Sequence, residues 1–186
     1  MPKPAPWLHQ LHQADAALYA AVARTRTPAL DRSMARLSDA ANYSRLSIAS
    51  AVLLSLLGGR RGRRAAAYGL ASVTVTATVV NLAVKPLTSR RRPDRAAEGV
   101  PADRHVRMPV STSFPSGHTA AAFAFATGVG HVMPLAAVPL RLLATAVAYS
   151  RVHTGVHYPG DVLAGSLIGV TLSRLTNPAL DRRRLA

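Results

Sequence analysis

The chain alternates between long apolar stretches that carry no formal charge and short segments that are rich in arginine. Residues 65–84 are uncharged over a length that can cross the hydrocarbon core of a bilayer. Pro134 is expected to divide another uncharged stretch, at 119–140. The pattern predicts about five spanning helices, near residues 46–58, 65–84, 118–132, 135–149 and 160–175.

The first 45 residues follow a different pattern, in which apolar side chains recur every three or four positions, as on one face of a helix. One such stripe consists of Trp7, Leu11, Ala14, Leu18 and Val22. Because the opposite face is polar, we expect this helix to lie on the membrane, with Trp7 as an interfacial anchor. A second amphipathic helix is expected from Thr27, as its N-terminal cap, to Ala41.

These patterns predict an all-α integral membrane bundle, with spanning helices preceded by N-terminal amphipathic helices. We expect interfacial helices in 1–45, the membrane domain in 46–176 and a basic polar tail in 177–186. The sequence "GGRRGRR" at 58–64 is expected to form a tight turn. The mean hydropathy of +0.15 is low for a membrane protein because it averages apolar helices with arginine-rich connections.

The formal net charge of +15 is also typical of a nucleic-acid-binding protein. However, the arginines cluster between apolar stretches, and only one Trp, five Tyr and three Phe are present to stack on bases. We therefore expect the bilayer, with its anionic headgroups, as the partner and not nucleic acid. Without cysteine the chain has neither disulfides nor a Cys-based metal site, and "MPKPAPW" lacks the apolar core of a signal peptide.

The order of the predicted helices brings distant polar segments together. If the helix at 65–84 begins on the side of "GGRRGRR", it ends at Lys85 on the opposite side. The next two helices cross forward and back, so His118 and the segment "SRVHTGVHYPGD" at 150–161 lie on the same side as Lys85. Three polar clusters are thus predicted to form one site, while "GGRRGRR" and the basic C-terminal segment share the other side.

The residue types of this predicted site suit phosphoryl transfer. Lysine and arginine can hold phosphate oxygens, and backbone N–H groups at Ser116 and Gly117, just before a helix, can point at an anion. One histidine can attack phosphorus while another protonates the leaving oxygen. A carboxylate four residues beyond His157, that of Asp161, can orient the ring of that histidine.

Three sequence signatures then resemble those of the type 2 phosphatidic acid phosphatase superfamily. "KPLTSRRRP" at 85–93 resembles the first signature, "PSGH" at 115–118 the second and "SRVHTGVHYPGD" at 150–161 the third. They occur in order, each beside an apolar helix, and the resemblance covers about residues 46–175. In the third signature only His157, and not His153, has the required spacing.

The resemblance implies an all-helical membrane phosphatase that works without metal or other cofactor, through a phosphohistidine intermediate. By position it implies that His157 is the nucleophile, that Asp161 is its partner and that His118 protonates the leaving group. It also implies that the phosphoryl oxygens are held by Lys85, Arg92, Ser116, Gly117 and Arg151.

Several alternatives compete with this interpretation. Taken singly, Lys85 and Arg92 could snorkel at a helix end, and Ser116 and Asp161 could cap helices. A zinc site on His153 and His157 is disfavoured because Gly155 lies between them and no H-E-x-x-H motif is present. The apolar spans disfavour a vanadate-dependent haloperoxidase, as found in the same superfamily. The intact signatures disfavour a non-enzymatic membrane protein with a degenerate anion site.

Residues outside the signatures receive default assignments. We expect Arg90, Arg91 and Arg95 to contact lipid headgroups. His105 and His131 are expected to be structural or solvated, and His153 to neighbour the site without an assigned task, where it could touch the substrate.

A membrane-embedded phosphatase is expected to act on a lipid phosphate whose tail stays in the bilayer. Polyprenyl-linked phosphates, including a pyrophosphate, are favoured because "LDRSMARLSDAANYSRLSIA" resembles compact bacterial members that dephosphorylate decaprenyl-phosphoryl ribose 5-phosphate in cell-envelope metabolism. Phosphatidylglycerophosphate and phosphatidic acid are the alternatives. We expect a multi-pass protein of the inner or plasma membrane with an extracytoplasmic site, since "GGRRGRR" and "DRRRLA" favour the cytoplasm. The sequence does not specify an oligomeric state.

Overall fold

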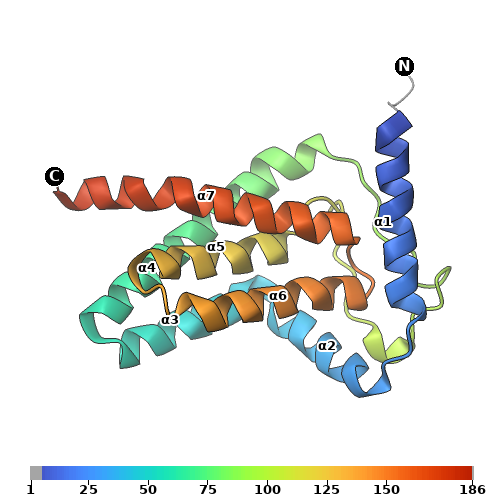
Figure 1. The fold of residues 1–186 in the computed structure, drawn as a ribbon, viewed down its shortest axis with the longest axis horizontal. Helices are drawn as coiled ribbons and strands as arrows, with labels where there is room; N and C mark the ends of the chain where they lie inside the picture. Colours follow the sequence, from blue (N-terminus) through green and yellow to red (C-terminus); the bar gives the residue numbers. More distant parts are fainter. Residues whose placement is uncertain (1–5, 186) are drawn as a thin grey trace.

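The computed structural model describes residues 6–185, which are mostly helical (Figure 1). The α-helices are α1 (Pro6–Arg24), α2 (Pro28–Ala40), α3 (Arg45–Leu57), α4 (Gly59–Val79), α5 (Gly117–Val132), α6 (Ala137–His153) and α7 (Pro159–Leu185). Short helical turns are η1 (Asn42–Ser44), the π-helical η2 (Val80–Val84), η3 (Lys85–Leu87) and η4 (Ala102–Arg104). Within this range there is no strand, so the predicted all-α class is confirmed.

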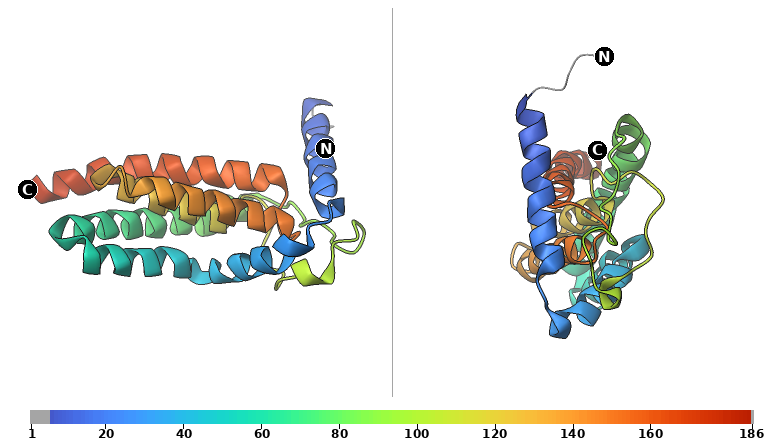
Figure 2. Two further views of the ribbon diagram at one scale, coloured as in Figure 1. Left: turned by 60° about the horizontal axis from the view of Figure 1, so that its bottom comes forward. Right: turned by 90° about the vertical axis from the view of Figure 1, so that its right-hand side faces the viewer.

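Helices α3 to α7 run side by side, and α1 stands across one end of this bundle (Figures 1 and 2). α5 is the central helix, packed against α4, α6 and α7, with buried Ala124, Phe125 and Val129 in its core. The packing is close: a Cβ on Gly169 of α7 would lie 2.2 Å from the carbonyl oxygen of Ala120 on α5. Small residues at such contacts let helix backbones approach each other, as is common in membrane bundles.

The outer surface of the bundle is strongly apolar. By length and composition, one helical stretch, Gly59–Leu87, could span a membrane, and α2 with α3 qualifies as a pair bent by 68°. Large exposed apolar side chains occur on α3, α6 and α7, among them Leu56, Leu57, Leu142, Leu163, Leu167 and Leu175. That about five helices cross the membrane therefore stays a prediction.

The bend between α2 and α3 has an unusual backbone. Tyr43 and Ser44 both have φ of 56°, in the left-handed region that non-glycine residues rarely adopt. Such conformations cost on the order of 1–3 kcal/mol each and persist where surrounding contacts fix them. The bend brings Asn42 to the start of α5, where it contacts His118.

One prediction for a basic segment was wrong, and the last helix is longer than predicted. "GGRRGRR" is not a turn: only Gly58 separates α3 from α4, and the arginines form the first turns of α4, since arginine is a good helix former. The last helix, expected to end near residue 175, continues to Leu185, and the basic tail at 177–186 as a separate segment stays a prediction. Residues 1–5 and 186, which belong to the predicted N-terminal region and tail, lie outside the described residues.

Contacts around Asp181 join the C-terminal part of α7 to α4 and α5. The Tyr68 hydroxyl and Arg64 Nη2 on α4 donate to Asp181 Oδ1 at 2.5 and 3.3 Å, and His131 Nε2 on α5 donates to Oδ2 at 2.8 Å. The start of α4 and the C-terminal part of α7 therefore share one end of the bundle, as the helix order predicted.

The N-terminus of α2 also differs from expectation. Thr27 occupies the cap position but makes no side-chain capping bond. Its hydroxyl instead donates to Asp31 Oδ1 at 2.9 Å. The division of the chain at residue 45 coincides with the start of α3 and otherwise stays a prediction.

Candidate active site

The turn between α6 and α7 sets the position of His157. α6 ends at His153, and Gly155 follows with φ of 67°. The N–H of Val156 reaches back to the carbonyl oxygen of Arg151 at 3.1 Å, one of the bonds of a Schellman motif. Because glycine tolerates this left-handed conformation, the chain can reverse sharply here, and His157 lies in the turn after α6 and not on the helix itself.

His157 is paired with Asp161 at the start of α7. Pro159 is the first residue of this helix, and Oδ2 of Asp161 accepts the backbone N–H of Tyr158 at 2.9 Å, as an acidic residue in a capping box does. The same oxygen accepts Nδ1–H of His157 at 3.4 Å and the hydroxyl of Ser113. Asp161 thus caps the helix and also orients the imidazole, whose Nε2 is left to face the site.

Of two cations in the connection after α4, Arg92 contacts this Nε2 and Lys85 is joined to Arg92 through Ser111. Arg92 Nη1 is 3.3 Å from Nε2 of His157. Lys85 Nζ donates to the Ser111 hydroxyl at 3.0 Å, and Arg92 Nη2 contacts the same hydroxyl at 3.3 Å. The ends of the first and third signatures therefore meet in space.

The N-terminus of α5 lies between these groups. The N–H of Ser116 donates to the backbone oxygen of Asp161 at 3.0 Å, which joins the starts of α5 and α7. The Ser116 hydroxyl lies 3.0 Å from that of Thr119 and makes no side-chain capping bond. A Cβ on Gly117 would lie 3.8 Å from Lys85 Nζ, so the helix start faces the lysine directly.

Arg151 is a buried cation with spare hydrogen-bonding capacity. It is 1% exposed, and its Nη1 donates to the backbone oxygen and hydroxyl of Ser38 at 3.1 and 2.6 Å. Its Nε has no hydrogen-bond partner within residues 6–185. A buried unsatisfied donor costs free energy, and a bound anion would relieve that cost.

His118 is oriented by the α2–α3 bend. Its Nε2 donates to Asn42 Oδ1 at 2.9 Å. Its ring lies within electrostatic range of Arg151, His157, Lys85 and Arg92. The structure therefore gathers all eight predicted site residues at one end of the bundle.

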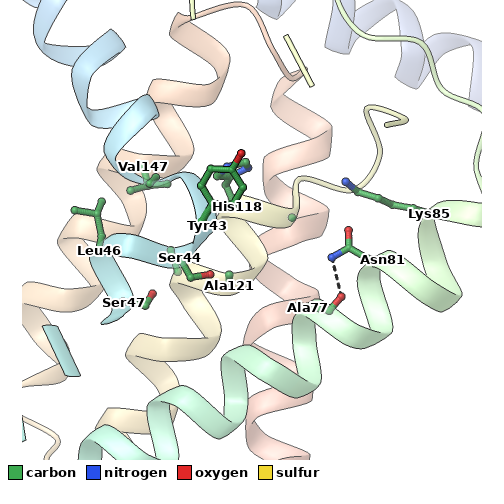
Figure 3. Close-up of a pocket in the computed structure, with 13 residues that line it drawn as sticks. Tyr43, Ser44, Leu46, Ser47, Ala77, Asn81, Lys85, His118, Ala121 and Val147 are labelled. Carbon is green, nitrogen blue, oxygen red and sulfur yellow. Dashed lines mark hydrogen bonds between the residues drawn. The ribbon is translucent and has the colours of Figure 1, made fainter. Parts of the chain in front are cut away.

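A cavity opens beside His118 and Lys85 (Figure 3). Figure 3 shows Lys85 and Asn81 reaching it from the α4 side, and Tyr43 and Ser44 from the α2–α3 bend. Its volume is about 180 Å³, and the rest of its lining is largely apolar: Leu46, Ala77, Ala121, Ala122 and Val147. The cavity thus joins a cationic region to an apolar one.

Burial determines the protonation of His157. With its side chain enclosed, desolvation lowers the pKa of His157 to about 4, against the opposing effect of the hydrogen bond to Asp161. The positive charges of Arg92 and Arg151 lower the pKa further. The imidazole is therefore neutral at physiological pH, with the lone pair of Nε2 facing Arg92 Nη1.

The assignment of two arginines to lipid headgroups was wrong. Arg90 donates to Asp15 Oδ2 at 2.5 Å and to Asp161 Oδ1 at 2.8 Å. Arg95 is half-buried and donates to the backbone oxygen of Val106 at 2.8 Å. Both side chains bind groups of the protein because the connection between α4 and α5 folds back over the end of the bundle.

The idea that His153 could touch the substrate was also wrong. His153 is 1% exposed, and its Nε2 donates to Asp31 Oδ1 at 3.1 Å, an oxygen that also accepts from Arg104. His157 instead binds Asp161, so the two histidines belong to different clusters. Within the described range, no group of three or more His, Cys, Asp or Glu side chains is arranged to hold a metal.

The remaining expectations outside the signatures fit the structure. His105 donates to the backbone oxygen of Val100 at 3.0 Å and His131 to Asp181, so both are structural. Arg91 is exposed, and its contact with headgroups stays a prediction.

Sequence reasoning missed five side chains of the site. Ser111 and Ser113 lie in the polar run "STSFPSGH", so their nearness to the second signature was an available signal. Arg90 lies within the first signature but has no slot in it, and Asn42 and Asp15 have no comparable signal because they meet the site only through helix packing.

The chain belongs to the PAP2 superfamily, whose model matches residues 64–185. This membership, with the helical membrane-type fold and the histidine–cation site, makes it a membrane-bound phosphatase that uses PAP2 chemistry. The expected family and enzyme class are thereby confirmed.

Among its relatives is the decaprenylphosphoryl-5-phosphoribose phosphatase of Mycobacterium tuberculosis, 34% identical over 143 residues that cover 73% of this chain and 74% of the relative. The lipid A 1-phosphatase of Rhizobium etli is 32% identical over 59% of this chain and 48% of its own length.

Solved structures support the same fold. The transmembrane PAP2-type phosphatidylglycerolphosphate phosphatase of Bacillus subtilis superposes with a TM-score of 0.71, at 24% identity over 94% of this chain and 87% of that one. LpxE of Aquifex aeolicus gives a TM-score of 0.67, at 25% identity over 86% and 92%.

Proposed function

We propose that this lipid phosphatase hydrolyses a polyprenyl-linked phosphate through a phosphohistidine on His157. The observation that carries the proposal is the state of His157: neutral, fixed at Nδ1 by Asp161, and with Nε2 next to Arg92, which shares the Ser111 hydroxyl with Lys85. A phosphoryl group bound by these cations would place its phosphorus in front of a lone pair. This is the arrangement of an activated nucleophile beside positively charged groups that stabilise the phosphoryl oxygens.

The first step transfers the phosphoryl group to the protein. Nε2 of His157 forms a bond to phosphorus as the bond from phosphorus to the leaving oxygen breaks. His118 enters this step as an imidazolium: it keeps Nε2–H on Asn42 Oδ1 and gives the proton of its other ring nitrogen to that oxygen. Asp161 stabilises the positive charge that develops on the His157 ring. The five phosphate-holding groups stabilise the phosphoryl oxygens: Lys85, Arg92, Ser116, Gly117 and Arg151.

The second step returns the nucleophile to its starting state. His118, now neutral, takes a proton from a water molecule whose oxygen attacks the phosphorus. The bond between phosphorus and Nε2 of His157 breaks, and inorganic phosphate leaves. No group outside the protein, water and substrate is required.

The cavity supports a lipid substrate. Its cationic rim, at Lys85 and His118, suits a phosphate, and its apolar lining suits the first carbons of a lipid chain. The mycobacterial relative favours decaprenyl-phosphoryl ribose 5-phosphate, while the structural neighbour from Bacillus subtilis keeps phosphatidylglycerophosphate as the second candidate.

A panel of lipid phosphates in detergent with EDTA tests this assignment. The panel contains decaprenyl-phosphoryl ribose 5-phosphate, a polyprenyl pyrophosphate, phosphatidylglycerophosphate and phosphatidic acid, and phosphate release is measured for each. The ribose 5-phosphate lipid is expected to have the highest kcat/KM. A higher value for phosphatidylglycerophosphate would transfer the assignment to the second candidate.

We further propose a multi-pass protein of the plasma membrane with an extracytoplasmic site. Support comes from the arginines at the start of α4, which lie at the end of the bundle opposite the site, together with Asp181 of α7. Short basic segments favour the cytoplasmic side of a membrane. Labelling of a single cysteine introduced at the exposed Ser89, with a membrane-impermeant reagent on intact cells, tests this orientation.

The acid limb of the pH profile should reflect the depressed pKa of His157. In the first step His157 acts as an unprotonated base, and the pH dependence of kcat/KM reports the groups of the free enzyme. Since burial lowers the pKa of His157 to about 4, the acid limb of kcat/KM should be centred near pH 4 and not near the ordinary value of 6.5. A single limb centred at about pH 6.5 would contradict a buried, neutral nucleophile.

Gly117→Ala should reduce turnover without reducing stability. The nearest atoms to an added Cβ are Lys85 Nζ at 3.8 Å and Val80 Cγ1 at 3.9 Å, which are ordinary contacts, so the protein itself accepts the methyl group. That methyl group would occupy space needed by a phosphoryl oxygen, and turnover is expected to fall about 10²-fold. Phosphate release and the melting temperature are measured together. In Gly165→Ala, whose Cβ would lie 2.5 Å from the Ser116 oxygen, the melting temperature itself should fall.

A further inference from the structure

The N-terminal helix α1 contributes a carboxylate to the end of the bundle that carries the site. α1 stands across this end (Figure 2), and its Asp15 side chain is only 13% exposed. Asp15 Oδ1 accepts the backbone N–H of Gly160 at 2.7 Å, and Oδ2 accepts Arg90 Nη2 at 2.5 Å. One side chain from α1 thus binds both the first turn of α7 and an arginine of the α4–α5 connection.

Arg90 links this carboxylate to the nucleophile pair. Its Nη1 donates to Asp161 Oδ1 at 2.8 Å, while Asp161 Oδ2 receives Nδ1–H of His157. The guanidinium lies 4.3 Å from the centre of the Tyr158 ring, within the range of a cation–π contact. The flat, two-pronged side chain of arginine is suited to hold two carboxylates at fixed positions.

We propose that Asp15 is a positioning residue for the His157–Asp161 pair, acting through Arg90 and the N-terminus of α7. This inference rests on the proposed function, in which His157 attacks phosphorus. Under it, α1 is a working part of the active site and not only a membrane-surface helix.

The geometry gives Asp15 two ways to act on the same pair. Its bond to Gly160 fixes the residue immediately before Asp161, and its bond to Arg90 fixes the cation on the outer oxygen of Asp161. Without Asp15, Arg90 would have a single carboxylate partner, and Asp161 could shift with it. A displacement of about 1 Å in a catalytic group can cost about 10²-fold in rate.

α1 does not depend on Asp15 for its attachment. Tyr19 and Ala23 on the same helix are 2% and 4% exposed and pack in an apolar cluster with Val100 and Val152. Removing one charge from Asp15 should therefore leave α1 docked. This allows the positioning role to be measured in a folded protein.

The test measures kcat and KM of the full chain in detergent, with decaprenyl-phosphoryl ribose 5-phosphate as the substrate. Asp15→Asn is expected to lower kcat about 10²-fold while KM changes less than about twofold, because Asp15 does not touch the substrate. Asp15→Glu should restore part of kcat. Arg90→Lys should resemble Asp15→Asn, because an ammonium cannot hold both carboxylates in the same way. Combining Asp15→Asn with Arg90→Lys should cost little more than either change alone.

Asp103→Asn is the matched control, since Asp103 is an exposed carboxylate paired with Arg32 at 3.3 Å. It should leave kcat, KM and the melting temperature unchanged. The inference is overturned if Asp15→Asn keeps the wild-type kcat or changes KM alone. It is also overturned if Asp15→Asn and Asp15→Glu both lower the melting temperature, and the loss of kcat in Asp15→Asn follows that fall. If His157→Ala retains turnover, the proposed function fails instead, so the two failures are distinguishable.

Discussion

His157→Ala is expected to abolish phosphate release, with a loss on the order of 10⁶-fold in kcat, as for the loss of a nucleophile in other hydrolases. The reason is that the site holds a single neutral ring in the attacking position, with Nδ1 on Asp161 and Nε2 beside Arg92. His118 is held in another position, with Nε2 on Asn42, and has the separate task of protonating the leaving oxygen. Phosphate release from the lipid panel in EDTA measures the loss directly.

A covalent intermediate provides a second measurement of the same variant. With a substrate carrying radiolabelled phosphate, rapid quenching in alkali should leave label on the wild-type protein, since phosphohistidine survives alkali and is lost in acid. His157→Ala should retain no label. Full turnover in this variant, or loss of wild-type activity on addition of EDTA, would refute the proposed mechanism.

His153→Gln is the matched control for His157→Ala. His153 is equally buried, but its partner is Asp31, and glutamine can still donate a hydrogen bond to that carboxylate. Turnover per folded molecule should therefore stay within about threefold of wild type. His153→Ala should also cost far less turnover than His157→Ala, and equal losses would reopen the choice between the two histidines.

The sequence was sufficient to predict the meeting of Lys85, His118 and the segment 150–161. Each lies at the end of an apolar helix, and helices that cross a bilayer in alternate directions must return such ends to the same side. The distinction between His153 and His157 was also predictable, but from signature spacing alone. Its physical basis is the turn at Gly155, which ends α6 and separates the two rings.

The contributions of the N-terminal helices could not be predicted in this way. Asp15 on α1, Ser38 on α2 and Asn42 at the bend reach Arg90, Arg151 and His118 across more than 70 residues of sequence. Amphipathic periodicity shows which face of a helix is apolar, and it does not specify which partner its polar residues meet. The left-handed backbone at Tyr43 and Ser44 gave no signal either, because neither residue is glycine or asparagine.

The arginine-rich segment after α3 shows a different limit of prediction from sequence. The sequence "GGRRGRR" contains three glycines, which favour a turn, and four arginines, which favour a helix. The helix prevails because these residues continue directly into the apolar part of α4, so that only Gly58 is needed for the reversal. Local composition could not decide between the two outcomes.

Arg104→Ala is expected to be the most destabilising single change outside the site. Arg104 is fully buried, and its guanidinium donates to Asp31 Oδ1 at 2.8 Å, to Thr27 Oγ1 at 3.0 Å and to the backbone oxygen of Thr25 at 2.5 Å. Two further bonds reach carbonyl oxygens in the last turn of α1, at Val22 and Ala23. This one side chain therefore joins the end of α1, the start of α2 and the connection that leads to the site.

Removing Arg104 would leave the Asp31 carboxylate buried without its cation, next to carbonyl groups that also lose their donor. Breaking a buried ion pair from one side costs about 3–5 kcal/mol, which in a chain of this size lowers the melting temperature by about 6–20 °C. Thermal unfolding in detergent measures the shift. Arg104→Lys should recover little of the lost stability, because an ammonium group cannot reproduce the five hydrogen bonds of the guanidinium. Arg32→Ala, which breaks the exposed pair with Asp103, is the control and should change the melting temperature by less than about 2 °C. An equally small shift for Arg104→Ala would show that the contacts of Arg104 do not stabilise the N-terminal helices.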